Sequence, residues 1–190
     1  MGLTPLAGAI MGTRSGDIDP AIIIYMMEKE GFSHQEINNI LNNKSGLLGI
    51  TGKYSDRRDI EIFANEGDVR CSLAIEMEAY RLKKYIGAYM AAIEDKIDAI
   101  VFTGGGGEMD AGLRERTLQG LESLGITLDK TKNENTRSRE TESFISRDDS
   151  KIKILVIPTN EELVLIEDVV AILEGRYDVH TNFTYSFQEK

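Results

Sequence analysis

Apolar residues recur at helical spacing through the first half of the chain, and short unbroken apolar runs replace that pattern later. A first helix is predicted from Asp19, which caps it, and Pro20, which suits the first helical position. Its apolar face comprises Ile22, Ile23, Met26 and Met27. Ser33 and Glu36 have the spacing of a capping box and predict a second helix that runs to about Asn42.

Two more helices are predicted before the pattern changes. Asp56 begins a short helix, after a segment over residues 46–56 that is expected to be a loop with short extended pieces. Asp68 caps the longest predicted helix, which runs to about Glu94. The apolar positions at helical spacing along it are Leu73, Met77, Tyr80, Ile86 and Met90.

A first strand is predicted at residues 98–103, an apolar run typical of a buried strand. A four-glycine turn over residues 104–107 follows, and then an amphipathic helix over residues 109–124 that Gly125 ends. α/β proteins hold phosphates and metal ions at the sharp turn that connects the end of a strand to the start of a helix.

A second buried strand is predicted at residues 151–157, and Thr159 or Asn160 then caps a helix over residues 161–173. The polar stretch over residues 129–150 is expected to be a surface excursion without much core.

The order of these elements implies an α/β layer architecture with parallel strands. Two or three recognisable strands make a poor sheet, even with a loosely alternating tail over residues 179–187. We therefore expect part of the sheet to be missing, as it would be in the C-terminal portion of a longer protein.

Composition narrows the class of partners. A hydrophobic content of 41% is ordinary for a globular protein, and the longest apolar stretches are too short to span a bilayer. A net charge of −10 disfavours nucleic acid and anionic membranes, because both bind basic patches. Cys71 is the only cysteine, so the chain forms no internal disulfide, which suits a cytoplasmic location. An anionic nucleotide would need local donors, namely backbone N–H groups, a few arginines and a divalent cation.

Arg14 lies between Gly12 and Gly16 in an otherwise uncharged loop. Its guanidinium can offer a planar fork to a phosphoryl or carboxylate group, and the glycines let another molecule approach the backbone. The alternative is an exposed surface arginine, with Asp19 explained as a helix cap.

A second charged cluster, from Asp56 to Asp59, opens the short third helix. An arginine of this cluster, Arg57 or Arg58, can stack on an adenine base while a carboxylate accepts a hydrogen bond from the ribose. The alternative is a solvated first turn with exposed charges.

The glycine run over residues 104–107 costs backbone entropy that a plain turn does not require. Its exposed N–H groups can cradle a phosphate or let a ribose lie flat on the backbone. The run matches neither the phosphate-loop pattern nor the dinucleotide fingerprint, so a plain turn remains the alternative.

Glu161 and Glu162 stand in the first turn of the last predicted helix. Carboxylates there complement the helix dipole and need no further role. One that faces the carboxyl edge of the sheet can instead bind Mg²⁺, directly or through water.

These residues lie in stretches that resemble one family. The chain resembles the C-terminal half of the acetate kinase family, whose superfamily includes sugar kinases and actin, through MGTRSGDIDPAI, NKSGLLGITGKYSDRRDIE, KKYIGAY, DAIVFTGGGGE, GLESLGI and DDSKIKILVIPTNEEL. The resemblance implies an α/β fold of the ribonuclease-H-like, actin-like ATPase type, a nucleotide-binding domain that is incomplete because the N-terminal half is absent. The expected domains are a partial nucleotide-binding domain over residues 1–160 and a helix and tail over residues 161–190 that return toward the missing N-terminal domain.

The resemblance also implies roles for the chemistry-bearing residues. Arg14 corresponds to the catalytic arginine that stabilises the phosphoryl group during transfer. The residues expected to border the nucleotide are Asp56, Arg57, Arg58, Gly105, Gly106, Gly107, Glu108 and Met109. Glu161 corresponds to the Mg²⁺-associated glutamate of the family.

The glycine run departs from the family pattern. FTAGIGEN of the family is FTGGGGEM here, so Gly106 stands at an isoleucine position and Met109 at an asparagine position. The adenine pocket is therefore expected to be looser and to lack one polar partner. Family members are also much longer, and the missing half carries the catalytic aspartate and the acyl-substrate pocket.

The implied activity is that of an acetate kinase, which transfers a phosphoryl group from ATP to acetate with Mg²⁺ and gives ADP and acetyl phosphate. The alternatives are a related propionate or butyrate kinase and, from another class, a non-catalytic nucleotide-binding or dimerisation module. A homodimer is expected, because family members dimerise through this half, with no nucleic-acid or membrane partner. The isolated chain is expected to be inactive, because much of the phosphoryl-transfer machinery lies in the missing half.

Overall fold

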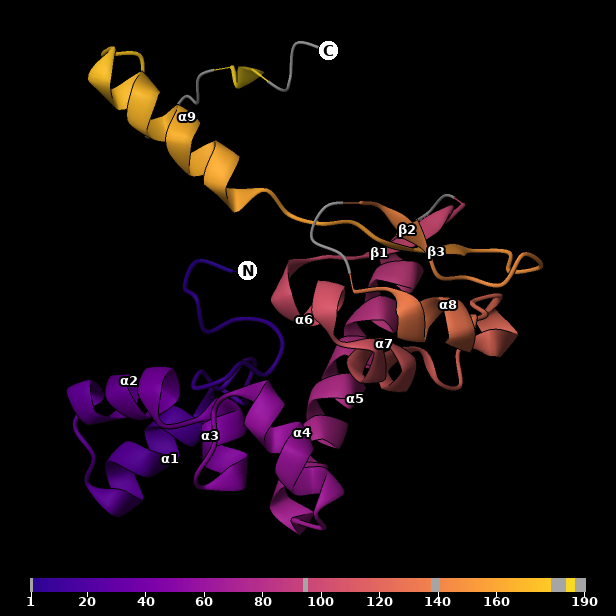
Figure 1. The fold of residues 1–190 in the computed structure, drawn as a ribbon. Helices are drawn as coiled ribbons and strands as arrows, with labels where there is room; N and C mark the ends of the chain where they lie inside the picture. Colours follow the sequence, from indigo (N-terminus) through magenta and orange to yellow (C-terminus); the bar gives the residue numbers. More distant parts are fainter. Residues whose placement is uncertain (1, 94–95, 138–140, 179–183, 187–190) are drawn as a thin grey trace.

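The structure is a computed structural model that describes residues 2–93, 96–137, 141–178 and 184–186 of the 190-residue chain (Figure 1). The first half is helical and contains α1 (Ala21–Glu30), α2 (His34–Asn43), α3 (Gly46–Thr51), α4 (Arg57–Asn65) and α5 (Val69–Ala92). The second half contains β1 (Ala99–Phe102), α6 (Gly104–Met109), α7 (Ala111–Leu118), η1 (Glu122–Leu124), α8 (Lys130–Asn135), β2 (Ser143–Phe144), β3 (Lys153–Val156) and α9 (Glu161–Leu173). Figure 1 shows α9 standing apart from the other helices.

A mixed sheet in the order β1-β3-β2 lies in the second half of the chain. β1 and β3 are parallel, with Ala99 opposite Lys153, which confirms the predicted pair of strand–helix units. β2 runs antiparallel to β3. β1 forms an edge of the sheet, and Val101 within it is 48% exposed, so the prediction of a fully buried strand at this position is wrong. Its sequence is apolar enough for burial, but no other strand in the described residues covers that edge.

Side chains cap the helices largely where the sequence predicts. The predicted residues occupy the N-cap positions of α2, α4, α5 and α9, namely Ser33, Asp56, Asp68 and Asn160. The first helix begins one residue later than predicted, because Pro20 is its N-cap and Ala21 its first residue. Asp19 accepts from the Ala21 N–H at 2.9 Å and so still serves the start of that helix.

Residues 46–51 form helix α3, where the sequence predicts a loop. Gly46 has a φ of +63°, and a Cβ there would lie 2.1 Å from the Met11 carbonyl oxygen. This glycine therefore lets the start of α3 pack directly on the backbone of the N-terminal segment, and Leu47 beside it is buried. Close backbone packing, which local propensity does not encode, makes this segment helical.

The segment after β1 folds as short helices instead of a turn followed by one long helix. The glycine run itself is helical and forms most of α6. Asp110 then accepts from the Leu113 N–H and starts α7, which ends before Gly120 takes a φ of +84°. Two local signals, a cap and a left-handed glycine, outweigh the apolar pattern over residues 109–124.

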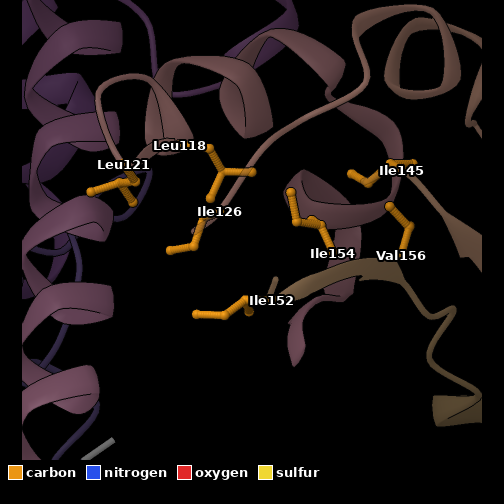
Figure 2. Packing of buried hydrophobic residues seen from close by; sticks show 7 residues of the cluster. All are labelled: Leu118, Leu121, Ile126, Ile145, Ile152, Ile154 and Val156. Carbon is orange, nitrogen blue, oxygen red and sulfur yellow. The ribbon is translucent and has the colours of Figure 1, made fainter. Parts of the chain in front are cut away.

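Two clusters of buried apolar side chains form the core. The cluster drawn in Figure 2 packs the sheet against α7 and comprises Leu118, Leu121, Ile126, Ile145, Ile152, Ile154 and Val156. The other joins α3, α4 and α5 and comprises Ile10, Leu47, Ile60, Cys71, Ala74 and Ile75. Ile145 belongs to the polar stretch over residues 129–150, which therefore does contribute to the core, contrary to expectation. That stretch contributes because it contains α8 and β2, and β2 pairs with β3.

Large apolar side chains remain exposed on several helices, most of them on α1, α5 and α9. Leu73, Met77 and Tyr80 on α5 are 51%, 39% and 63% exposed, so these apolar positions at helical spacing do not form a buried face, whereas Ile86 and Met90 pack against the core cluster of the sheet. α5 instead buries a different face, which comprises Cys71, Ala74, Ile75, Glu78 and Ala79. α1 buries none of its residues, including its predicted apolar face. The exposed apolar side chains of α9 are Leu165, Ile166, Val169, Val170, Ile172 and Leu173.

Among the residues that the structure describes, no helix combines the length and the apolar content needed to cross a membrane. The predicted alternation over residues 179–187 lies largely outside the described residues.

Candidate nucleotide site

Two cavities adjoin the glycine helix α6, which follows β1. The larger, which we name the arginine cavity, has a volume of ≈ 800 Å³, and its lining includes Arg57, Arg58, Gly105, Gly106, Met109, Arg116 and Arg137. The smaller, which we name the glutamate cavity, has a volume of ≈ 660 Å³, and its lining includes Gly105, Glu108, Thr159, Asn160, Glu161 and Glu162. Gly105 lines both cavities, so they meet at α6.

The arginine cavity concentrates positive charge in an acidic chain. Four arginines line it together with two carboxylates, those of Glu61 and Asp110, and the sequence does not predict Arg116 or Arg137 in the site. Gly106 and Met109 line the same cavity, so both departures from the family pattern fall on its wall. The cavity therefore offers an anionic ligand local cations within a chain of net charge −10.

Arg57, the first residue of α4, is held by surrounding carboxylates. Its Nε and Nη2 donate to Asp110 Oδ2 at 3.0 and 2.6 Å, and its Nη1 donates to Glu78. Glu61 lies 3.9 Å from Nη2. Arg57 thereby ties α4 to α5 and to the N-cap of α7, and its guanidinium is engaged within the protein.

Glu78, on α5, is a buried carboxylate that contacts this arginine. Burial raises the pKa of Glu78 to about 7; Arg57 lowers it, whereas Asp110 and Glu61 raise it further. Glu78 therefore changes charge near neutral pH while it contacts a residue of the cavity wall.

Arg58 and Asp56 form a pair at the surface. Arg58 Nη2 lies 2.6 Å from Asp56 Oδ2, and the arginine side chain is 87% exposed. Hydrogen bonds from the side chain and the backbone of Arg58 lower the pKa of Asp56 to about 2. Both residues thus form a solvated first turn, as the simpler sequence interpretation has it, and Arg58 also borders the arginine cavity.

Glu108, a residue of helix α6, accepts a hydrogen bond from the first residue of that helix. The Glu108 side chain is buried, and its Oε1 accepts from the backbone N–H groups of Gly104 and Thr159, each at 2.9 Å. The Thr159 hydroxyl donates to the same oxygen at 2.9 Å. Gly107 packs on β1, where a Cβ would lie 3.3 Å from that of Phe102. Glu108 therefore joins α6 to the segment that precedes α9.

Arg114 of α7 holds the other end of α6 and is fully buried. Its Nη1 donates to the carbonyl oxygens of Gly107 at 2.7 Å and Glu108 at 3.1 Å. Its Nε donates to Asn133 Oδ1, and its Nη2 donates to the Asn133 and Thr136 carbonyls at the end of α8. Burial lowers the pKa of Arg114. A cation at the C-terminal end of a helix complements its dipole, so Arg114 binds α6 and α8 together.

The Arg14 loop, over residues 8–17, is fixed by its main chain. The Ser45 N–H donates to the Thr13 carbonyl at 2.9 Å, and the Leu48 N–H donates to the Gly12 carbonyl at 2.9 Å. The Arg14 side chain is exposed and lines neither cavity. The structure therefore does not bring Arg14 together with the other predicted site residues.

Glu161 and Glu162 occupy the first turn of α9, and both line the glutamate cavity. Within the described part of the chain, no three His, Cys, Asp or Glu side chains gather so as to hold a metal ion. Mg²⁺ does not require such a cluster, since it commonly binds one or two carboxylates and completes its shell with water and phosphate oxygens.

Sequence reasoning missed the buried charges that hold the site. Glu78 carries a detectable signal, because it lies at helical spacing from Ala74 and Ile75, within the buried stripe of α5. Arg114 carries none, because its burial depends on α8, which folds over it from a stretch that reads as surface.

The sequence matches the family described as the Acetokinase family over residues 1–167. It is 62% identical to the acetate kinase of Trichlorobacter lovleyi over 98% of this chain and 44% of that protein. Among solved structures, the acetate kinase of Porphyromonas gingivalis aligns with a TM-score of 0.83 at 43% identity, covering 91% of this chain and 43% of that chain. A propionate kinase from Francisella tularensis aligns with a TM-score of 0.77 at 47% identity, covering 85% of this chain and 40% of that chain.

The fold and these neighbours define a partial α/β domain of the actin-like ATPase type, which confirms the predicted fold class. The chain belongs to the acetokinase family. It spans less than half the length of the curated relatives it matches.

Proposed function

We propose that this chain forms the nucleotide-binding part of an acetate kinase, which transfers a phosphoryl group from ATP to acetate and yields ADP and acetyl phosphate. One observation carries the proposal: a glycine helix and four arginines, which outnumber the carboxylates of Glu61 and Asp110 in the same lining, border a cavity of ≈ 800 Å³ in a chain whose net charge is −10. Local cations offset the repulsion that the whole chain exerts on an anionic nucleotide. The identity of 62% to an acetate kinase supports the same assignment.

In this proposal the nucleotide occupies the arginine cavity. Arg57 and Arg58 border the adenosine, and Asp56 holds Arg58. The glycine helix allows the nucleotide to approach the backbone closely, because Gly105 and Gly106 present no side chain to it. Met109 completes that wall, and Gly107 and Glu108 belong to the same helix, with Glu108 lining the adjoining glutamate cavity.

Mg²⁺ belongs to the glutamate cavity in this proposal, next to Glu161. Glu161 supplies carboxylate oxygens there, which are ligands that Mg²⁺ prefers, whereas the Thr159 hydroxyl is engaged with Glu108. When bound with the nucleotide, the ion would neutralise charge on the transferred phosphoryl group.

Arg14 acts in the transfer itself in this proposal. Its exposed guanidinium can donate two parallel hydrogen bonds to phosphoryl oxygens. Phosphoryl transfer depends mainly on positioning and on electrostatic stabilisation, so one well-placed arginine has a large effect.

The proposal treats residues 161–190 as a unit that packs against the N-terminal half of a longer protein, and residues 1–160 as the partial nucleotide-binding domain. The exposed apolar side chains of α9 support this division. The exposed apolar side chains of α5 support a homodimer that forms through this half. We place the protein in the cytoplasm and assign it no nucleic-acid or membrane partner.

A propionate kinase is the second candidate. The Francisella tularensis propionate kinase is 47% identical to this chain, against 43% for the Porphyromonas gingivalis acetate kinase. A non-catalytic nucleotide-binding or dimerisation module describes the isolated chain rather than the longer protein.

A chimera tests the proposal. This chain replaces the matching segment of the Trichlorobacter lovleyi acetate kinase, and acetyl phosphate is trapped as a hydroxamate in the presence of ATP, Mg²⁺ and acetate. Turnover close to that of the parent enzyme supports the proposal, and a folded chimera without turnover contradicts it. The second candidate is tested on the longer protein to which this chain belongs, assayed with acetate and with propionate, because the acyl-substrate pocket is expected outside this chain.

A further inference from the structure

Helix α6 has an unfavourable composition, because glycine loses more backbone freedom in a helix than any other residue. Buried charged side chains hold both of its ends, with Glu108 bonded to its first residue and Arg114 bonded to its last carbonyls. The geometry of this cavity wall is therefore set by tertiary bonds rather than by local propensity.

Glu108 also reaches across to a distant part of the chain. The same carboxylate oxygen that accepts from Gly104 accepts from the N–H and the hydroxyl of Thr159, all at 2.9 Å. Thr159 stands 51 positions further along the chain. Glu108 thus joins the end of one parallel strand, β1, to the end of the other, β3.

The segment held in this way leads directly into the glutamate cavity. Asn160, next to Thr159, is the N-cap of α9 and accepts from the Leu163 N–H at 3.0 Å. Glu161 is the first residue of that helix. A displacement of Thr159 would therefore carry the start of α9, and Glu161 with it.

We propose that Glu108 is a positioning residue that ties the strand end bearing Glu161 to the glycine helix, and so sets the metal-associated glutamate relative to the nucleotide. Glu108 acts through Gly104 and Thr159 and does not need to touch the nucleotide. The inference rests on the proposed function, because both the nucleotide and the metal belong to it.

The test measures ADP affinity of the chain by titration calorimetry with and without Mg²⁺. Glu108→Ala is expected to reduce the gain in affinity that Mg²⁺ brings by about 10-fold, the effect typical of losing a residue that orients a metal ligand. The affinity for ADP without Mg²⁺ should not fall, since the removal of a negative charge beside the cavity cannot weaken the binding of an anion electrostatically. If the substitution merely damaged the structure, the affinity for ADP would fall both with and without Mg²⁺.

Two variants separate positioning from direct metal binding. Thr159→Val removes the hydroxyl partner but no charge, and it should reduce the Mg²⁺-dependent gain by about 3-fold, a smaller loss than that of Glu108→Ala. Combined with Glu108→Ala it should add nothing, because both changes break the same link. Glu108→Gln keeps an acceptor oxygen and should recover most of the gain. Glu122→Ala removes an exposed carboxylate elsewhere and serves as the control for charge.

Amide hydrogen exchange provides a readout that needs no nucleotide. The Gly104 and Thr159 amides should exchange at least about 10-fold faster in Glu108→Ala than in the wild type. Effects of Thr159→Val and Glu108→Ala that add together, or exchange rates that do not change, would overturn the inference. If Glu108→Ala fails to fold by circular dichroism, Glu108→Gln and Thr159→Val decide the question by the same measurements.

The outcomes distinguish this inference from the proposed function. A wild-type chain that binds no ADP overturns the proposed function, and the inference with it. A wild-type chain that binds ADP with a Mg²⁺-dependent gain that Glu108→Ala leaves unchanged overturns the inference alone.

Discussion

Two glycine-containing segments of this chain are held in different ways. The Arg14 loop is fixed largely by main-chain bonds, such as that from the Ser45 N–H to the Thr13 carbonyl at 2.9 Å, together with the Asp17 carboxylate, and its arginine side chain remains exposed. Helix α6 is fixed by the buried side chains of Glu108 and Arg114, and its glycine backbone lines two cavities.

The bonds that fix a segment determine which of its groups remain available to a ligand. A segment fixed through its main chain leaves a charged side chain available, and a segment fixed through side chains leaves its backbone available. Main-chain bonds do not titrate in the physiological range, and hydrogen bonds lower the pKa of Asp17 in the Arg14 loop, whereas burial raises the pKa of Glu78, which contacts Arg57, to about 7, so the surroundings of the two segments should respond differently to pH.

The largest expected effect is on the α6 side. Arg114→Met should lower the free energy of unfolding by on the order of 3 kcal/mol or more, because the carbonyls of Gly107, Asn133 and Thr136 lose a buried donor. Urea denaturation measures this, with Arg114→Lys as a control that keeps the charge and should lose less. A loss below about 1 kcal/mol would mean that buried charge does not hold this helix.

The exposed Arg14 should affect activity strongly and stability little, the reverse of what is expected for Arg114. In the chimera, Arg14→Ala should reduce kcat by roughly 10²-fold with little change in the KM for ATP, because the guanidinium acts mainly in the transition state. Its free energy of unfolding should change by less than about 0.5 kcal/mol, as expected for an exposed side chain. Steady-state kinetics and urea denaturation test the two halves of this prediction. An unchanged kcat with a raised KM would assign Arg14 to ground-state binding.

The third prediction uses pH to separate the two regions. Burial raises the pKa of Glu78 in the folded chain to about 7, from an ordinary value of 4.5. The protonated form therefore favours folding, and this contribution is complete below pH 4.5 and is lost as the pH rises through 7. Glu78 should thus lower the free energy of unfolding by roughly 2 kcal/mol between pH 5 and pH 8.

Glu78→Gln should remove that slope, as measured by urea denaturation at a series of pH values. The control lies on the same helix, where the Tyr85 hydroxyl donates to Asp17 of the Arg14 loop. Tyr85→Phe should lower stability about equally at pH 5 and pH 8, because the pKa of Asp17 is lowered by Tyr85 and then by the Gly8 N–H, so it ionises below this range. If the free energy of unfolding had the same dependence on pH in Glu78→Gln as in the wild type, Glu78 would not be the group that titrates.

The smallest effects come from single glycines in α6. Gly105→Ala should stabilise the chain by about 0.5–1 kcal/mol, because a Cβ there meets no atom within 4 Å and alanine reduces the freedom of the unfolded chain. Gly104→Ala should instead destabilise it by about 1–2 kcal/mol, because Gly104 has a φ of +71°. Thermal denaturation compares the two variants, and a stabilised Gly104→Ala would show that α6 does not need a left-handed start.

Features that depend on near neighbours in sequence could be predicted. The capping residues Ser33, Asp56 and Asp68 start their helices as predicted, because a cap acts on backbone groups within three residues. The parallel strands could also be found, since their apolar runs are short and bounded by turn-forming residues.

Features that depend on packing between distant parts of the chain could not be predicted from the sequence. The stripe of Leu73, Met77 and Tyr80 has the spacing of a buried face, but α5 buries the face that carries Ala74, Ile75 and Glu78 instead. The glycine run was correctly placed after a strand, but its helical form depends on Glu108 and Arg114, which meet it only in the folded chain. The structure brings most of the predicted nucleotide residues to the two cavities and leaves Arg14 outside them.

Strand β1 has a practical consequence for work with the isolated chain. Its four residues, AIVF, contain no charge and no proline, and among the described strands only β3 pairs with it. Such an edge is a template onto which another extended chain can add, and natural proteins usually blunt it with charge, proline or a covering element. Expressed alone, the chain would recruit further copies of itself along this edge, so aggregation would limit the protein concentration that the binding experiments can reach.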